Sequence, residues 1–487
     1  MHDKFSEAQA QASTAKQTFY ITTAIPYVNG KPHIGHALEY FQADTIRNYH
    51  KILGQETLLL SGADENALKN VQAAEKEGIP VQEFLDKNSL VFKEAYTKLG
   101  VTLDVFERGS DKQSHFPGVQ KLWELCAANG DIYKKSYTGL YCVGCESFKT
   151  DKELNDGKCP DHQVAPERVT EENYFFKLTK YQDKLTQLIE SDTLQVVPVS
   201  KKNEILSFIK GGLEDFSVSR SKDRAKGVGV PVPDDLNQVM YVWFDALAIY
   251  ITGIGYGTNQ QMFEKWWPAN VHVIGKDINR FHTVYWPAML LSAGLEIPKT
   301  ILVHGFVQSN GQKMSKTLGN VIDPFEISEK YGLEGFRYYM LSQIPTDDDG
   351  DFTIERFREV YNADLANGLG NLTARVSKLC EKVNLKSEFI PRTFSDPVKR
   401  ALDEFSFNKA LEHIWSEIKK SDKLINEEKP WEKEGDKLIS ILSALSLTIA
   451  QIGFDLQPFL PNTANKILTQ FTSDKITSSQ PLFPRLP

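Results

Sequence analysis

The sequence predicts an α/β protein in which a parallel β-sheet is interrupted by an inserted module and followed by an all-helical region. Three observations predict this. A strand, helix and strand pattern occupies 19–64, strand- and helix-like segments return between 236 and 360, and Leu, Ile and Ala recur at helical spacing beyond 360. With 487 residues the chain is too long for a single core, so several domains are expected.

The first segments form a βαβ unit. The β-branched run at 19–25 predicts a strand, and "PYVNG" then marks a turn. Apolar residues at helical spacing predict a helix from Gly35 to Leu53, with Gly54 as its stop, and "ETLLLSGAD" predicts a second strand. The two strands should therefore be parallel, and ligands should bind beyond their carboxyl ends, where "PHIGH" and "SGADEN" lie.

The remaining chain changes character twice. The stretch at 116–235 is distinguished by its cysteines and charged loops, and the apolar segment "VMYVWFDALAIY" begins the second α/β half. The predicted parts are a polar tail at 1–17, the first half of the α/β domain at 18–115, an insertion at 116–235, the second half at 236–360 and a helical region at 361–487.

Composition excludes several classes of protein. A formal net charge of -8 argues against a surface coated in positive charge for non-specific nucleic-acid binding. No run of 18 apolar residues occurs, so no membrane partner is expected. The polar N-terminal stretch resembles neither a secretory signal nor a transit peptide, which predicts a cytoplasmic location. Five cysteines do not make a disulfide framework.

Two motifs carry phosphate chemistry. A helix N-terminus suits phosphate, Gly35 permits close approach of a ligand, and His33 and His36 supply donors. Some 280 residues later "KMSKT" places Lys313, Ser315 and Lys316 in a glycine-punctuated loop, as a cationic clamp for pyrophosphate. Alone, the histidines could be ordinary turn residues and the lysines a solvated surface. Together, the two motifs resemble the "HIGH" and "KMSKS" signatures of class I aminoacyl-tRNA synthetases, with Thr317 in place of the last serine.

A cysteine cluster lies in the predicted insertion. Cys142, Cys145, Cys159 and His162 form C-x2-C-x13-C-x2-H, a spacing that suits one closed tetrahedral Zn²⁺ site. Because the chain fills all four positions, the zinc is expected to be structural. The alternative is a set of buried thiols.

Two aromatic-rich stretches predict the amino-acid pocket. "YVWFDALAIY" supplies Trp243, Ala246, Leu247 and Tyr250, and "GKDINRFHTVYW" supplies Asp277, Ile278, His282 and Trp286. With Tyr27 they predict an apolar cavity whose walls suit a polarizable thioether. The alternative is that these aromatic residues belong only to the core.

The resemblance is to the methionyl-tRNA synthetase family from about residue 18 to the end of the helical region. "AIPYVNGKPHIGHA", "GKDINRFHTVYWPAML", "VHGFVQSNGQKMSKTLGNVIDP" and "NGLGNLTARV" carry it. It implies a Rossmann-type catalytic domain, a zinc-knuckle connective module and a helical-bundle anticodon-binding domain. It also implies L-methionine, ATP, Mg²⁺ and tRNA(Met), initiator included, as substrates or partners.

The resemblance also implies roles for individual residues. Asp64 would hold the α-ammonium of methionine, assisted by backbone near Ala24 and Ile25. Asn371, Arg375 and Trp431 would read the anticodon. The side chains implied to line the methionine site are Tyr27, Trp243, Ala246, Leu247, Tyr250, Ile278, His282 and Trp286. One departure is "DENA" at 64–67, where many relatives carry "DEHG", so that Asn66 and Ala67 replace His and Gly.

The implied function is ATP-dependent attachment of methionine to tRNA through a methionyl-adenylate. Retention of both histidines, both lysines and Asp64 disfavours a catalytically silent tRNA-binding paralogue. A related class I enzyme for another amino acid is the other alternative. Because the chain ends just beyond the helical region, a monomer is expected.

Overall fold

The computed structural model describes residues 17–144, 147–149, 151–160, 163–314, 320–387 and 390–487. The chain divides into two compact units, each described by itself below. Unit 1 contains the residues up to 32 together with 54–98 and 102–303. Unit 2 contains 33–53, 99–101 and 304–487.

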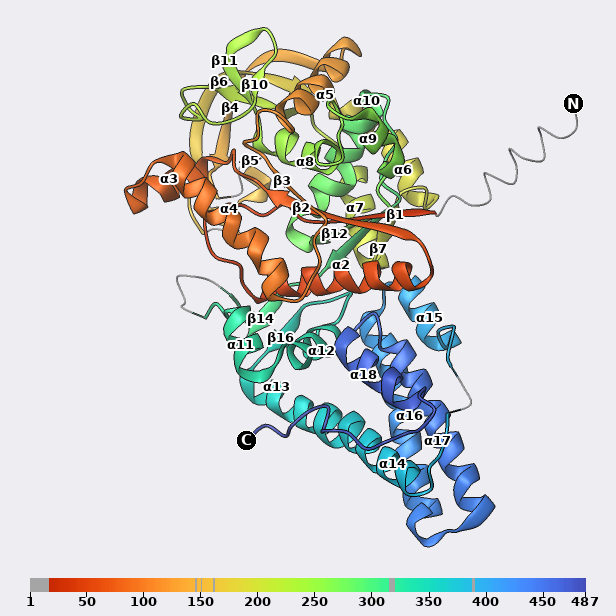
Figure 1. Cartoon of the computed structure of the whole chain (residues 1–487). Helices are drawn as coiled ribbons and strands as arrows, with labels where there is room; N and C mark the ends of the chain where they lie inside the picture. Colours follow the sequence, from red (N-terminus) through yellow and green to blue (C-terminus); the bar gives the residue numbers. More distant parts are fainter. Residues whose placement is uncertain (1–16, 145–146, 150, 161–162, 315–319, 388–389) are drawn as a thin grey trace, which may run out of the picture. The chain divides into compact units, whose positions relative to one another are not determined.

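A six-stranded sheet forms the centre of unit 1 (Figure 1). β1 pairs in parallel with both β2 and β12, which confirms the predicted parallel βαβ arrangement. The edge strand β7 comes from the segment predicted as an insertion and pairs in parallel with β13. The strand order is β3 (Val105–Arg108), β2 (Glu56–Ala63), β1 (Thr18–Thr23), β12 (Val271–Gly275), β13 (Thr300–His304) and β7 (Gln195–Val197).

Helices between these strands complete the core of unit 1. The apolar helix α8 (Val242–Thr252) is buried along its whole length, because it packs among the strand residues and α5. This explains why its sequence is apolar on every side. The other α-helices are α3 (Leu68–Glu77), α4 (Val81–Lys98), α5 (Phe116–Ala128), α6 (Gln182–Glu190), α7 (Val199–Lys210), α9 (Gln260–Trp266) and α10 (Trp286–Ser292).

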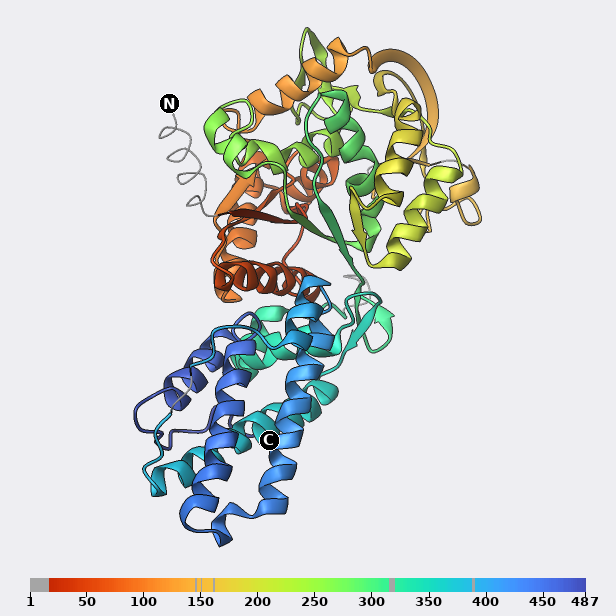
Figure 2. The same ribbon diagram turned by 90° about the vertical axis from the view of Figure 1, so that its right-hand side faces the viewer.

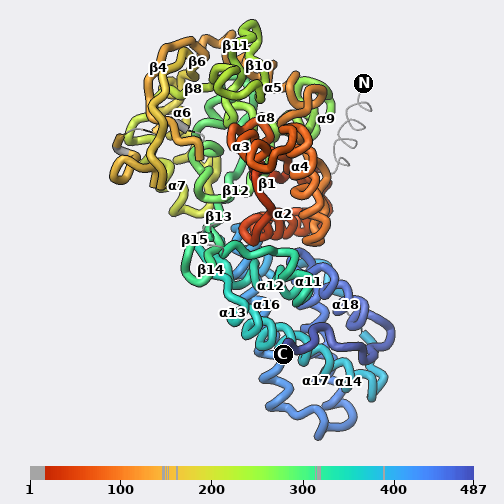
Figure 3. Tube along the Cα trace, turned by 90° about the vertical axis from the view of Figure 1, so that its left-hand side faces the viewer, coloured from red at the N-terminus to blue at the C-terminus, as the bar shows by residue number. Residues whose placement is uncertain are grey.

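Antiparallel strands form a separate layer within unit 1. Alternation of exposed and buried residues along β6 fits a sheet with one face on the core. Figure 3 shows β4, β6 and β8 close together, and their sheet has the order β5-β4-β6-β8. Its strands are β4 (Ile132–Cys142), β5 (Ser147–Lys149), β6 (Glu167–Phe176) and β8 (Phe216–Ser217). A further three-stranded sheet has the order β10-β11-β9 and consists of β9 (Ser219–Ser221), β10 (Pro231–Val232) and β11 (Asp235–Met240).

Unit 2 is mainly helical, as predicted for the region beyond 360. Its blue helices α16 and α17 run side by side (Figure 2). Three short strands precede the helical region: β14 (Val307–Ser309), β15 (Gln312–Lys313) and β16 (Gly350–Phe352). The helices are α2 (Ile34–Ile52), α11 (Pro324–Tyr331), α12 (Leu333–Gln343), α13 (Ile354–Val360), the π-helical η5 (Tyr361–Gly370), α14 (Asn371–Lys382), α15 (Asp396–Asp403), α16 (Phe407–Glu428), α17 (Gly435–Asp455) and α18 (Pro461–Phe471).

The helix α2 lies within one residue of its predicted bounds. Gly54 follows it with a φ of +87°, the left-handed conformation that glycine adopts readily after a helix. Within unit 2, α2 packs on α12, where Asp44 and Arg337 form a buried ion pair at 2.6 Å. Arg337 also donates to the backbone carbonyls of Pro458 and Phe459. Buried charges need such partners, so this pair fixes α2 in unit 2.

Among the described residues, α17 is the one helix long and apolar enough to cross a membrane by length and composition. Its residues pack against α14, α16 and α18, and Leu442, Leu445, Ile449 and Ile452 are buried there. The apolar composition is therefore explained by its place in the helical bundle.

Candidate functional site

A hollow in unit 1 is lined by side chains that the sequence predicted for the amino-acid pocket, together with Ile25, of which only the backbone was expected to contribute. The residues Trp243, Ala246, Leu247 and Tyr250 lie three, one and three positions apart on α8, so they share one helix face. The full lining is Ile25, Trp243, Ala246, Leu247, Tyr250, Ile278 and His282. The hollow is thus built from the end of β1, one face of α8 and the turn that follows β12.

His282 is held neutral at the wall of this hollow. Burial lowers the pKa of His282 to about 4. Its Nδ1 lies 3.0 Å from the carbonyl oxygen of Ile278, so this nitrogen carries the hydrogen and donates. Nε2 is then the acceptor for the Tyr250 hydroxyl at 2.7 Å. The wall therefore presents a fixed, uncharged imidazole.

Trp243 is fixed by ring contacts. Phe281 stacks on it with centroids 3.8 Å apart and planes 7° apart, and Tyr27 meets it edge-on at 6.3 Å. Sequence reasoning missed Phe281. It opens a five-residue π-helical turn, Phe281–Tyr285, and such turns often mark functional sites. Its position immediately before His282 in "RFHT" was the available signal.

Asp64 lies beside Tyr27 at the carboxyl ends of β2 and β1. The two residues form an isolated parallel bridge, in which the Asp64 N–H donates to the Pro26 carbonyl at 2.9 Å. Asp64 is 3% exposed, and its own carbonyl accepts from the Asn70 amide at 2.8 Å. Adjacent parallel strands thus bring Asp64 and Tyr27 together, as the βαβ geometry predicts.

The other residues predicted for this pocket lie outside its lining. Trp286 is buried at the start of α10, with its ring 6.3 Å from that of Tyr250, so it supports the wall from behind. Ala24 is half-buried and packs on the same core. Asp277 is exposed, and its role stays a prediction.

The predicted phosphate motif begins α2, in unit 2. His33 is the N-cap, and its Nδ1 accepts from the Gly35 N–H at 3.1 Å. His36 Nδ1 accepts from the His33 N–H at 3.1 Å, which completes a reciprocal capping box. Burial, with the neighbouring His33 and His304, lowers the pKa of His36 well below its usual value. Because Nδ1 of each ring accepts a backbone N–H, Nε2 of each ring carries the hydrogen and can donate it.

Gly35 is required by this cap. A Cβ at position 35 would lie 2.9 Å from Cε1 of the His33 ring, closer than carbon atoms normally approach. The missing side chain at Gly35, which was predicted to let a ligand approach, therefore also leaves room for the capping ring of His33.

The segment that follows the second phosphate motif contacts the same helix end. Lys313 ends β15, while Ser315 and Lys316 lie outside the described residues. The chain is described again from Asn320, and the Ile322 carbonyl accepts from the Ile34 N–H at 3.2 Å. Within unit 2, the segment after "KMSKT" thus contacts the first turn of α2.

Half of the predicted zinc set can be described. Cys142 ends β4, Cys159 follows the Asn155–Lys158 turn, and both are fully buried. Cys145 and His162 lie outside the described residues. Within the part of the chain that is described, three or more potential metal ligands nowhere gather into a site. The four-ligand set therefore stays a prediction.

Two of the predicted anticodon residues meet in unit 2. The Arg375 guanidinium lies 5.9 Å from the ring centroid of Trp431, which is 52% exposed. Arg375 also faces Asp422 at 4.0 Å. Asn371 is exposed at the start of α14, one turn before Arg375. The three form an exposed surface with an aromatic face and hydrogen-bonding groups.

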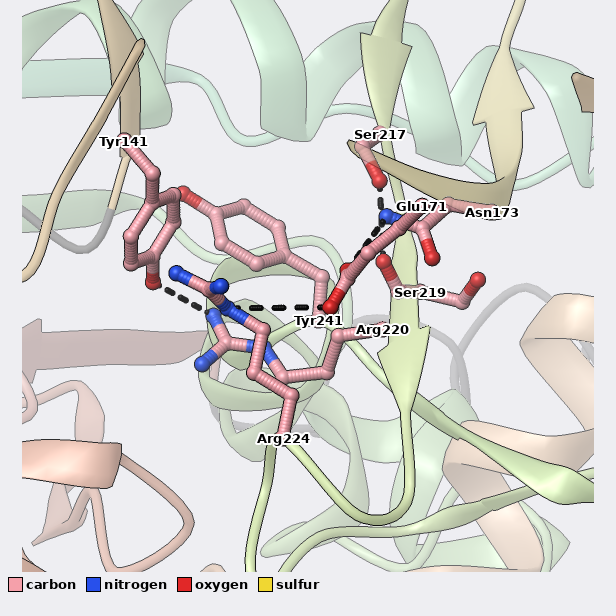
Figure 4. A pocket seen from close by; sticks show the side chains of 8 residues that line it. All are labelled: Tyr141, Glu171, Asn173, Ser217, Ser219, Arg220, Arg224 and Tyr241. Atoms are coloured by element: carbon pink, nitrogen blue, oxygen red, sulfur yellow. Dashed lines mark hydrogen bonds and ion pairs between the residues drawn. The ribbon is translucent and has the colours of Figure 1, made fainter. Parts of the chain in front are cut away.

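A second hollow lies among the antiparallel strands of unit 1 (Figure 4). The Arg220 guanidinium donates to the Tyr141 hydroxyl at 2.8 Å, and Arg224 lies 3.8 Å from Glu171. The Asn173 amide donates to the same carboxylate at 3.1 Å. The polar groups around this hollow are thus bonded largely to one another, and none of the predicted site residues lies there.

Comparison with known proteins identifies related chains. The family model described as class I tRNA synthetases (M) matches residues 19–168 and 153–377. A methionine–tRNA ligase from Brucella suis biovar 1 is 39% identical over 475 residues, covering 93% of this chain and 92% of the relative. One from Caldanaerobacter subterraneus subsp. tengcongensis is 40% identical, covering 93% of this chain and 74% of the relative.

Solved structures agree. The Mycobacterium tuberculosis methionyl-tRNA synthetase in complex with methionyl-adenylate superposes with a TM-score of 0.88 at 34% identity, covering 96% of this chain and all of the other. The free form of that protein superposes with a TM-score of 0.82 at 31% identity, covering 97% and 99%.

Proposed function

Because the chain belongs to the methionyl-tRNA synthetase family, we propose that it attaches L-methionine to tRNA(Met) through a methionyl-adenylate. The observation that carries the choice of amino acid is the neutral, aromatic hollow whose lining consists entirely of residues expected for a methionine site. A flexible thioether gains from contact with such rings, whereas a charged side chain would lose its hydration there.

The reaction has two steps. The methionine carboxylate attacks the α-phosphorus of the Mg²⁺–ATP substrate, the α–β phosphoanhydride bond breaks, and pyrophosphate leaves. A hydroxyl of the terminal adenosine of tRNA then attacks the adenylate carbonyl and releases AMP. Neither step needs a covalent bond to the enzyme, so rate acceleration comes from positioning and from charge stabilisation.

In unit 1, the hollow would hold the side chain of methionine, and Asp64 would bind its α-ammonium. The burial of Asp64 beside Tyr27 supports this role, because a carboxylate in a low-dielectric site binds an ammonium more strongly than one in water. Ile25 would contribute to the lining and Ala24 to the backbone around it. The neutral state of His282 keeps competing charge out of the pocket.

In unit 2, the first turn of α2 would bind phosphate through its N-terminus, with Nε2–H donors from His33 and His36. Lys313 and Lys316, with Ser315, would close on the pyrophosphate as charge develops. Replacing Lys316 by Ala should lower adenylate formation about 100- to 1000-fold, the usual cost of losing one such donor, and change methionine binding little. Unchanged single-turnover adenylation would refute this role.

One structural zinc would be held by Cys142, Cys145, Cys159 and His162. The full burial of Cys142 and Cys159 fits thiolate ligands of a closed site. Bound there, zinc would supply a cross-link between the two turns and no chemistry. Metal analysis should find one zinc per chain, and Cys159→Ser should lose it. Retention of a full equivalent by that variant would refute the ligand set.

Asn371, Arg375 and Trp431 would bind the anticodon, including that of initiator tRNA. The exposed Trp431 ring can stack on a splayed base, while Arg375 and Asn371 bond base edges. A monomeric state and a cytoplasmic location stay predictions. Light scattering, which measures the molar mass in solution, tests the monomeric state.

The deciding experiment is amino-acid-dependent ATP–pyrophosphate exchange with each of the twenty amino acids. Methionine alone should support exchange. Exchange with another amino acid would overturn the assignment of the pocket. No exchange by the folded protein would instead favour a silent tRNA-binding paralogue.

A further inference from the structure

Asn66 joins the segment that carries Asp64 to the helix that carries the hollow. Its Nδ2 lies 2.6 Å from Oδ2 of Asp245 on α8 and 2.7 Å from the carbonyl oxygen of Gly109. The amide has two hydrogens, so both are used. One side chain thus connects the ends of β2 and β3 with α8.

Asp245 is held in place from a second direction. Its Oδ1 lies 2.5 Å from Nε2 of His115, and Nδ1 of that ring lies 2.7 Å from the Thr252 hydroxyl. The side chains of His115 and Asp245 are both buried. A buried carboxylate needs such donors, so Asp245 is bound firmly only when Asn66 and His115 are both present.

Asp245 occupies a different face of α8 from the residues that line the hollow. Two positions along a helix correspond to about 200° of rotation, so Asp245 lies nearly opposite Trp243. The bond to Asn66 therefore holds α8 on the face opposite the hollow, so that the face with Trp243 is left to line the hollow.

We propose that Asn66 is a positioning residue that, through Asp245, fixes the Asp64 carboxylate relative to the thioether walls and so sets recognition of the α-ammonium of methionine. This inference rests on the proposed function. It assigns a role to the asparagine that stands where many relatives carry histidine, and an imidazole N–H can likewise donate to Asp245.

Glu65 shows that Asn66 does more than order its own segment. The Glu65 carboxylate accepts from Ser89 on α4, from Arg108 at the end of β3 and from Ser110. Those bonds already anchor the segment to α4 and β3. Asn66 instead donates a hydrogen bond from this segment to Asp245 on α8, which is the element that carries the pocket.

The test compares two ligands in equilibrium binding: L-methionine and 4-(methylthio)butanoate, the same molecule without its ammonium group. Asn66→Ala should weaken methionine binding about 10- to 100-fold, the usual worth of one hydrogen bond to a charged group, and leave the deaminated ligand within about twofold. Asn66→His should restore most of the preference for methionine.

Two controls separate positioning from general destabilisation. Asn129→Ala removes another asparagine that donates to a carboxylate, Asp131, and should leave the preference unchanged. If Asn66→Ala does not fold, Asp245→Ala removes the acceptor of the Asn66 amide and should show the same selective loss.

Each outcome decides the proposal. A selective loss for methionine that Asn66→His reverses would support it, whereas equal losses for both ligands, or no loss, would overturn it. Wild-type exchange with methionine is measured alongside. Its absence would refute the proposed function itself, whereas normal wild-type exchange with an unselective Asn66→Ala would refute only this inference.

Discussion

The hollow of unit 1 and the helix α2 of unit 2 are stabilised in different ways. The hollow is built from stacked rings around a neutral histidine, whose Nε2 accepts from the Tyr250 hydroxyl. The helix α2 is held by charge through the buried Asp44–Arg337 pair, and its Glu39 carboxylate also lies 3.1 Å from Nε2 of His304.

The difference follows from the chemistry that each region would meet. A thioether needs apolar contact and a steady shape, which rings provide. A helix end that would face phosphate must stay in place while negative charge develops beside it. Buried ion pairs give that position at the cost of sensitivity to losing either partner. The free energy of unfolding should therefore depend on pH through the neutral histidine of the hollow, and on each of the two buried charges that hold α2.

The largest expected effect is on α2. Arg337→Ala would leave Asp44 buried without its guanidinium, which should lower the free energy of unfolding by about 3–5 kcal/mol. Urea denaturation followed by circular dichroism measures it. Arg356→Ala, which removes exposed contacts with Glu359 and Gln343, should change it by less than about 0.5 kcal/mol.

A second variant sharpens this result. Replacing both partners, Asp44→Leu with Arg337→Met, should recover much of the loss, because no charge then remains buried. If Arg337→Ala alone were as stable as the wild type, the ion pair would not anchor α2.

The next effect concerns the hollow and pH. The pKa of His282 is about 4 in the folded protein, against an ordinary value near 6.5, so between these values the unfolded chain binds the additional proton. Stability from this site is therefore complete above about pH 6.5 and falls by about 3 kcal/mol as pH approaches 4. Unfolding free energies of wild type and His282→Gln across pH 4–8 should converge toward low pH.

The exposed His413 provides the control, because His413→Gln should give a curve parallel to that of the wild type. Parallel curves for His282→Gln as well would show that the folded protein tolerates a charged ring in the hollow.

A smaller effect contrasts two tryptophans. Trp243 is 7% exposed in the hollow, whereas Trp431 is 52% exposed beside Arg375. Trp431→Ala should weaken tRNA(Met) binding by about 1–3 kcal/mol, the usual worth of one base stacked on an aromatic ring. Filter binding measures it, and Trp431→Phe should retain most of the affinity. Full affinity in the alanine variant would place the anticodon elsewhere.

Sequence patterns predicted the parts of this molecule that are local or repeated. The order of β1, α2 and β2 follows from hydrophobic period and turn residues, and the lining of the hollow, apart from Ile25, comes from two aromatic-rich stretches. The family resemblance supplied the proposed roles of Asp64 and of the anticodon residues, which no pattern of spacing could give.

What the sequence did not predict depends on distant partners. Asp44 and Arg337 are each single charges in helices, and nothing local pairs them. The strand β7 has three residues, too few for a clear alternation. In the sequence, Asn66 shows only a difference from relatives that carry histidine there. Its bond to Asp245 is visible only in the structure. Such contacts are decided by packing, which periodicity alone does not encode.

The smallest effect tests how closely the polar atoms of the hollow are matched. Tyr250→Phe removes the hydroxyl that donates to Nε2 of His282 and leaves that nitrogen buried, which should cost about 1 kcal/mol of stability and a few-fold in methionine affinity. Titration calorimetry measures the affinity. Tyr20→Phe removes a hydroxyl that donates only to the backbone carbonyl of Tyr250, so it should lower stability similarly and leave methionine binding nearly unchanged. Equal affinity losses in both variants would show that the bond between Tyr250 and His282 contributes nothing specific to methionine binding, and that the packing of the rings alone shapes the hollow.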